Sequence, residues 1–88
     1  AGIAAWDPGE EMLSAIEFLM NTKRVSPKDI LLLNEIADTT WEICRFMGRP
    51  AYFQKGRQIL GYMLYPQFPK EIRDKAVEIM RKIADSKL

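Results

Sequence analysis

The chain has 88 residues, of which 48% are hydrophobic and 28% are charged, and its formal net charge at pH 7 is +1. A chain of this length supports one hydrophobic core, and its composition is too apolar for intrinsic disorder. No apolar run is longer than four residues, as at 30–33 and 62–65, which excludes a membrane-spanning helix. We therefore expect one folded domain over residues 1–88 and no membrane partner.

The first residues, AGIAAW, have neither the basic leading segment nor the long apolar run of a secretion signal. They also lack an initiating Met, which is consistent with processing or with excision from a longer protein. The single cysteine, Cys44, has no partner for an internal disulfide and falls on an apolar helix face, where free thiols usually serve as core residues. The expected location is therefore cytoplasmic, in a reducing setting.

Proline and glycine divide the chain into four segments, each with the periodicity of an amphipathic helix. The first predicted helix covers about 8–22. Asp7 is placed to cap it, and Pro8 occupies its first position, where a missing N–H group costs nothing. Phe18 lies off the apolar stripe of this helix, which consists of Met12, Ala15, Ile16, Leu19 and Met20.

The second predicted helix covers about 27–47 and has the clearest start signal in the chain. Ser26 and Asp29 have the spacing of a capping box, and Val25 and Ile30 have that of a hydrophobic staple. Gly48, with a proline two residues later, is typical of a helix end.

Apolar residues cover a broad face of this second helix, so we expect it to be the central one. Leu31 and Phe46 project from its other side. We expect either the N-terminal segment or a partner to shield these two side chains from solvent.

The third predicted helix covers about 51–65 and ends before Pro66, and the fourth covers about 69–87. Three short connections bring neighbouring helices into contact. The expected fold is therefore an all-α, compact four-helix domain. Periodicity alone leaves open whether the helices form an up-down bundle or a more orthogonal packing.

Several classes of chemistry are excluded by composition. The chain has no histidine and one cysteine, so it cannot assemble a Ser-His-Asp site, a Cys-His site or a structural zinc site. Asp38 and Glu42 lie one helical turn apart but lack the further oxygen ligands that calcium requires. No glycine-rich phosphate loop is present. We therefore expect a non-enzymatic protein without a catalytic residue, metal, cofactor or small-molecule substrate.

Positive charge is concentrated in residues 43–69, which hold four bases and no acid. On a helical wheel, the polar face of the third helix combines amides, cations and two tyrosines. Arg and Lys contact phosphates, Gln can read adenine edges and Tyr can stack on bases. The leading prediction is therefore a DNA-binding or other nucleic-acid-binding surface on helix three, and the junction of helices two and three also permits a helix-turn-helix arrangement. Its residues are Arg45, Arg49, Gln54, Lys55, Arg57, Gln58, Tyr62 and Tyr65.

An alternative prediction is a protein-interaction or dimerisation domain. Its contact patch would consist of Phe18, Leu31 and Phe46 together with the tyrosines, because exposed aromatic and apolar side chains are typical of interface cores. The sequence pI of about 8.1 also lies below the value above 9 that is typical of strongly basic nucleic-acid-binding domains. The sequence leaves both partner classes, nucleic acid and protein, open.

Overall fold

The computed structural model describes residues 8–48 and 50–86, and these form an all-α domain of four helices without a strand. The helices are α2 (Pro8–Met20), α3 (Pro27–Met47), α4 (Pro50–Tyr62) and α5 (Lys70–Asp85). The predicted fold class and all four predicted helices are confirmed. In the described ranges no helix combines the length and the apolar character that crossing a membrane requires. The predicted cap residue Asp7 lies outside the described residues.

The predicted start and end of α3 are confirmed in detail. The backbone N–H of Asp29 donates to Ser26 Oγ at 3.2 Å, and the backbone N–H of Ser26 donates to Asp29 Oδ2 at 2.9 Å. At the other end Gly48 adopts a left-handed conformation with φ of 62°, and its N–H donates to the carbonyl of Cys44 at 3.2 Å. Glycine adopts this conformation without the steric cost of a side chain, so the helix ends there.

The end of α4 differs from the prediction. The helix stops at Tyr62, three residues before the expected end, and Tyr65 lies in the following turn. The N–H groups of Leu64 and Tyr65 bond to carbonyls three residues back, at 3.2 Å each, so the chain tightens before Pro66. Pro66 disfavours helical backbone at Tyr65, the residue before it, but the helix ends three residues earlier than this effect requires. The predicted ends of α2 and α5, at 22 and 87, likewise move inward, to Met20 and Asp85.

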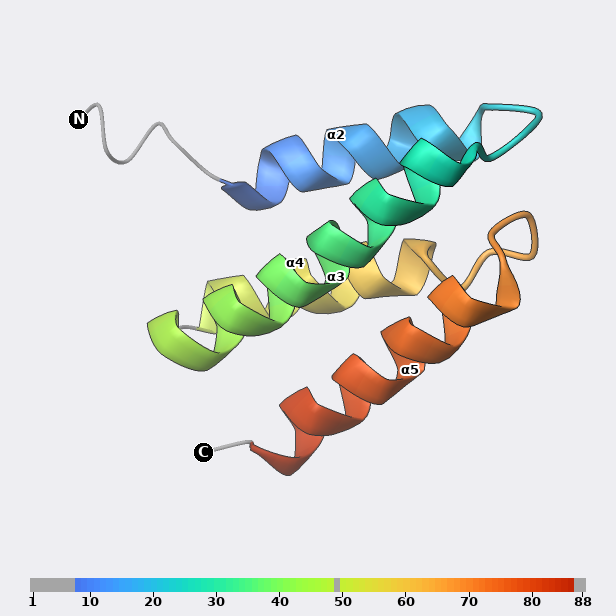
Figure 1. Cartoon of the computed structure of the whole chain (residues 1–88). Helices are drawn as coiled ribbons and strands as arrows, with labels where there is room; N and C mark the ends of the chain where they lie inside the picture. The colour runs from blue at the N-terminus through green and yellow to red at the C-terminus, as the bar shows by residue number, and fades with distance from the viewer. Residues whose placement is uncertain (1–7, 49, 87–88) are drawn as a thin grey trace.

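The four helices have an open arrangement with α3 and α4 at its centre. Figure 1 shows α3 crossing in front of α4, with α2 on one side of this pair and α5 on the other. Both outer helices contact both central ones, but within the described residues α2 and α5 do not contact each other. A closed up-down bundle would bring its first and last helices together. The described residues therefore do not form a closed up-down bundle, which was one of the two packings that periodicity left open.

The core lies between the two central helices and the inner faces of the outer ones. Ile16, Leu33, Leu60, Met63 and Ala76 have no exposed surface. Thr40 is the buried polar residue in the described ranges, and its hydroxyl donates to the Ile36 carbonyl at 2.7 Å. All four helices therefore contribute to one hydrophobic core.

Candidate functional site

The residues predicted to bind nucleic acid fall into three groups. Five are exposed: Arg45, Gln54, Arg57, Gln58 and Tyr65. Two others, Lys55 and Tyr62, are half-buried. Arg49 lies outside the described residues.

Lys55 faces α2 and forms an ion pair with the Glu10 carboxylate. Its side chain keeps 26% of its surface exposed. Part of the positive charge of Lys55 is therefore offset by an acid from a helix 45 residues away in sequence. The helical wheel of α4 placed Lys55 on a solvent face because the wheel contains no information about α2.

The two tyrosines of the predicted site contact each other. Tyr62 packs against the core, and its ring lies edge-on to that of Tyr65, with 5.9 Å between ring centroids and 74° between ring planes. Tyr65 retains 42% of its surface. One tyrosine, in the turn after α4, is thus exposed where two were predicted on the helix.

The exposed residues of α4 are Pro50, Ala51, Gln54, Arg57 and Gln58. Arg57 is the one cation among them. It lines an apolar groove between the start of α4 and the last turns of α5, together with Phe53, Met80 and Ile83. The outer side of α4 therefore has weaker positive charge than the sequence of the segment indicated.

Cys44 is buried against α4, which confirms the prediction that it serves as a core residue. Its Sγ lies 3.5 Å from the Tyr52 carbonyl oxygen, to which the thiol donates. Burial raises the pKa of the thiol, and the charge of Arg57 opposes this effect only in part. A thiol that stays protonated and buried is not an activated nucleophile.

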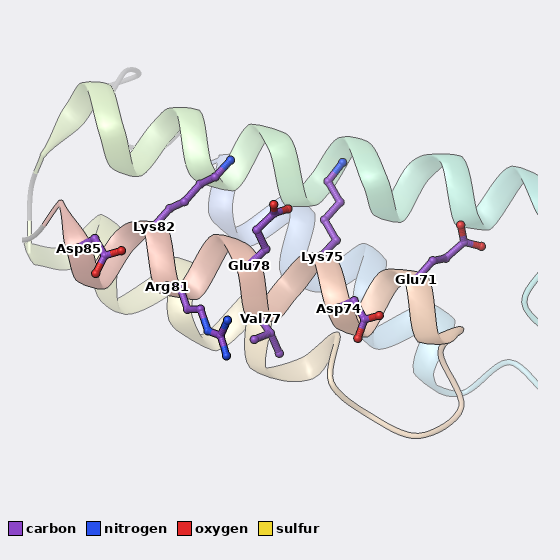
Figure 2. Close-up of a pocket in the computed structure, with 8 residues that line it drawn as sticks. All are labelled: Glu71, Asp74, Lys75, Val77, Glu78, Arg81, Lys82 and Asp85. Carbon is purple, nitrogen blue, oxygen red and sulfur yellow. The ribbon is translucent and has the colours of Figure 1, made fainter.

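The outer side of α5 carries a hollow lined by residues of that helix alone (Figure 2). Lys75 and Lys82 extend toward α3, whereas Val77 and Arg81 point away from it. Lys75 Nζ lies 3.0 Å from Asp38 Oδ1, and Lys82 Nζ lies 5.9 Å from the centroid of the Trp41 ring. These lysines therefore join α5 to α3. No group of three metal-ligating side chains occurs in the described part of the chain.

Three large apolar side chains are strongly exposed: Phe18 at 74%, Leu31 at 67% and Phe46 at 72%. The prediction that Phe18 lies off the stripe of its helix and that Leu31 and Phe46 project from α3 is confirmed. Phe18 belongs to α2, whereas the other two share one side of α3. The three do not form a single patch on one helix.

We define the outer face of α3 as Leu31, Glu35, Asp38, Glu42 and Phe46. Steps of four, three, four and four residues keep these side chains on one side of a helix, and all five are exposed. Leu31 and Phe46 are fifteen residues apart, or about 22 Å along the helix axis. This face is therefore an acidic strip with a large apolar side chain at each end.

The acids of this strip were missed as site residues. Taken singly, Glu35, Asp38 and Glu42 are ordinary acids on a polar helix face, which is usually just solvated. The spacing of these acids relative to Leu31 and Phe46, which can be read from the sequence, would have identified the strip.

The chain matches no protein-family model, no curated protein and no solved structure.

Proposed function

We propose that this chain is a protein-interaction module and that its docking surface is the outer face of α3. The observation that carries the proposal is the exposure of Leu31 and Phe46, at 67% and 72%, on the same side of one helix. Burying such a side chain fully is worth about 1.5–3 kcal/mol. Two anchors of this kind together contribute about 3–6 kcal/mol toward holding a partner helix across the face.

The rest of α3 is suited to presenting this surface. Its opposite side is buried, including Leu33, Ile36 and Cys44, and both of its ends are capped. The Arg45 guanidinium lies 5.0 Å from the Phe46 ring centroid, which is within the range of a cation–π contact. A helix held in this way presents its anchors in a fixed geometry, so this chain loses less conformational entropy when a partner binds.

The size of the surface sets the expected affinity. A strip about 22 Å long and about 10 Å wide, the diameter of one helix, covers a much smaller area than the roughly 800 Å² that each partner buries in a standard stable interface. We therefore expect a transient complex with a micromolar dissociation constant, unless neighbouring helices add to the contact.

The test is cross-linking in cells that produce the protein, followed by identification of the proteins attached to it. We expect the Leu31→Ser, Phe46→Ser double variant to lose a partner that the wild type and Phe18→Ser both retain. Because all three side chains are exposed, each substitution changes the stability by only about 0.5 kcal/mol, which circular dichroism can verify. Identical partners for wild type and double variant would refute the proposal, and an equal loss with Phe18→Ser would refute its assignment to α3.

Nucleic-acid binding is the second candidate, supported by the exposure of Arg45, Gln54, Arg57 and Gln58. Since Lys55 is paired with Glu10, the informative change is Arg45→Glu with Arg57→Glu. A fluorescence-anisotropy titration with labelled DNA and RNA at low salt tests it. Binding that this variant loses but the Lys23→Glu, Arg24→Glu control keeps would favour the second candidate. Absence of binding by the wild type would eliminate it.

A further inference from the structure

We propose that the partner of the outer face of α3 is a basic amphipathic helix, with two cations seven residues apart and an apolar residue four positions outside each. This inference rests on the proposed function and specifies the chemistry of the partner. It follows from the order of apolar and charged residues along the face, which reads apolar, acid, acid, acid, apolar.

The charge of the central strip defines what can approach it. Asp38 is engaged by Lys75 from α5 at 3.0 Å. Glu35 and Glu42 have no ion-pair partner within the described residues. They lie seven residues apart, which is two helical turns or about 10 Å. Two cations with the same separation on a facing helix would meet both carboxylates.

The apolar anchors extend this pattern symmetrically. Leu31 precedes Glu35 by four residues, and Phe46 follows Glu42 by four residues. A facing helix therefore meets the same spacing in either direction. The two cations of α3, Lys28 and Arg45, lie near the ends of the strip: Lys28 precedes Leu31 by three residues, and Arg45 is adjacent to Phe46. Positive charge on the partner is thus directed to the centre of the face.

A second copy of this chain is a poorer occupant of the face. If two copies of α3 pair in antiparallel fashion so that Leu31 of one copy meets Phe46 of the other, Glu35 lies opposite Glu42 at both ends. Like charges in direct opposition destabilise an interface. The same carboxylates repel the phosphates of a nucleic acid. The register that buries both anchors therefore favours a basic partner over either alternative.

The test uses a capped, alanine-based helical peptide of about 20 residues as the probe. It carries two lysines seven residues apart, each with a leucine four residues further out. A second peptide has glutamate in place of both lysines. Binding of each to the ¹⁵N-labelled protein is followed by amide chemical shifts, and affinities are measured by fluorescence anisotropy. We expect the lysine peptide to shift amides of α3 and to bind at least about tenfold more tightly than the glutamate peptide.

Charge reversal supplies the matched comparison. Glu35→Lys with Glu42→Lys should weaken binding of the lysine peptide about tenfold and strengthen binding of the glutamate peptide. Glu17→Lys with Glu78→Lys makes the same change in net charge on exposed positions of α2 and α5, and should leave the preference intact. Equal binding of the two peptides by the wild type, absence of shifts on α3, or an equal effect of both variants would overturn the inference.

These results separate the inference from the proposed function. If the lysine peptide does not bind but the cellular partner is still lost with Leu31→Ser, Phe46→Ser, the docking surface stands and the basic helix is wrong. If sedimentation shows a dimer of the wild type that the same double variant abolishes, the occupant is a second copy and the inference is also wrong.

Discussion

At Gly56 the absence of a side chain allows α4 to pack closely against α3. A Cβ added there would lie 2.8 Å from Cys44 Sγ and 3.2 Å from Thr40 Cγ2, and both neighbours are buried. Overpacking of this kind costs about 1–3 kcal/mol, while replacing a helical glycine by alanine recovers up to about 1 kcal/mol. We expect Gly56→Ala to lower the free energy of unfolding by about 1 kcal/mol in urea denaturation.

Gly61 provides the control for this prediction, because it lies in the same helix and a Cβ there meets no atom within 4 Å. Gly61→Ala should leave the stability unchanged or raise it by up to about 1 kcal/mol. Adding Cys44→Ala to Gly56→Ala removes the closest contact and should restore part of the loss. Equal stability of Gly56→Ala and Gly61→Ala would contradict the packing argument.

The thiol of Cys44 makes the stability depend on pH in the alkaline range. Burial raises its pKa above the ordinary value of 9.0, with Arg57 opposing the shift in part. The folded chain therefore holds this proton at a pH where the unfolded chain releases it. The corresponding stability is complete below the unfolded pKa and is lost as pH rises through the folded pKa.

Urea unfolding of wild type and Cys44→Ala between about pH 7 and about pH 10.5, under reducing conditions, measures this contribution. The wild type should lose more stability than the variant above pH 9.0, the ordinary thiol value. Ionisation of other groups affects both proteins and cancels in the comparison. Parallel pH profiles would show that the thiol makes no such contribution.

At the scale of the helix, the contribution of the capping box of α3 to the stability of the domain can be measured. Ser26 accepts from the N–H of Asp29 at 3.2 Å, and the Asp29 carboxylate accepts from the N–H of Ser26 at 2.9 Å. Ser26→Ala removes the hydrogen bond that Ser26 Oγ accepts from the N–H of Asp29, and should lower the free energy of unfolding by about 1 kcal/mol. For a domain of this size that is a fall of about 4–8 °C in Tm.

Circular dichroism melting measures this change, with Ser14→Ala as the control. Ser14 is exposed inside α2, where alanine is the better helix former, so its replacement should not lower the Tm. If both variants melt at the wild-type temperature, the cap contributes nothing to the stability of the domain.

The helices could be predicted from sequence because their signals are local. Ser26 with Asp29, and Gly48 with its following proline, determine both ends of α3 within a few residues. The end of α4 was misplaced because the helical pattern continues to Tyr65, while the turn before Pro66 tightens the backbone. Extending the wheel to Tyr65 put two tyrosines on one face, although the second lies beyond the helix.

The pairing of charged residues at the candidate sites was harder to predict because the partners belong to different helices. The pairing of Lys55 with Glu10 joins α4 to α2, and that of Lys75 with Asp38 joins α5 to α3. The periodicity of a single helix does not specify contacts across 45 or 37 residues. The outer face of α3 lies within one helix, and its apolar ends, Leu31 and Phe46, were therefore visible from spacing alone.

At the scale of the whole molecule, the open arrangement makes the two outer helices unequal. Within the described residues, α5 buries Ile72, Ala76, Ile79 and Ile83, whereas the buried apolar side chains of α2 are Leu13, Ile16 and Leu19. Apart from its core packing, the contacts of α2 include the Lys55–Glu10 ion pair and a hydrogen bond from Gln67 Nε2 to the Met20 carbonyl at 2.8 Å. Both of these polar interactions are exposed to solvent and contribute little to the stability of α2.

In the described part of the chain, the outer helices α2 and α5 each contact two other helices, whereas α3 and α4 each contact three. Elements with fewer tertiary contacts open at a lower free energy than the global unfolding reaction. We therefore expect native-state hydrogen exchange to be fastest in α2, intermediate in α5 and slowest in α3 and α4. Lys55→Ala should speed exchange in α2 by less than about fivefold, because it removes one exposed ion pair. Exchange of α2 at the rate of α3 would mean that the four helices open as one unit. The predicted order leaves α3, the helix of the proposed docking surface, in the most stable part of the molecule, so a partner would meet a preformed surface even while α2 opens.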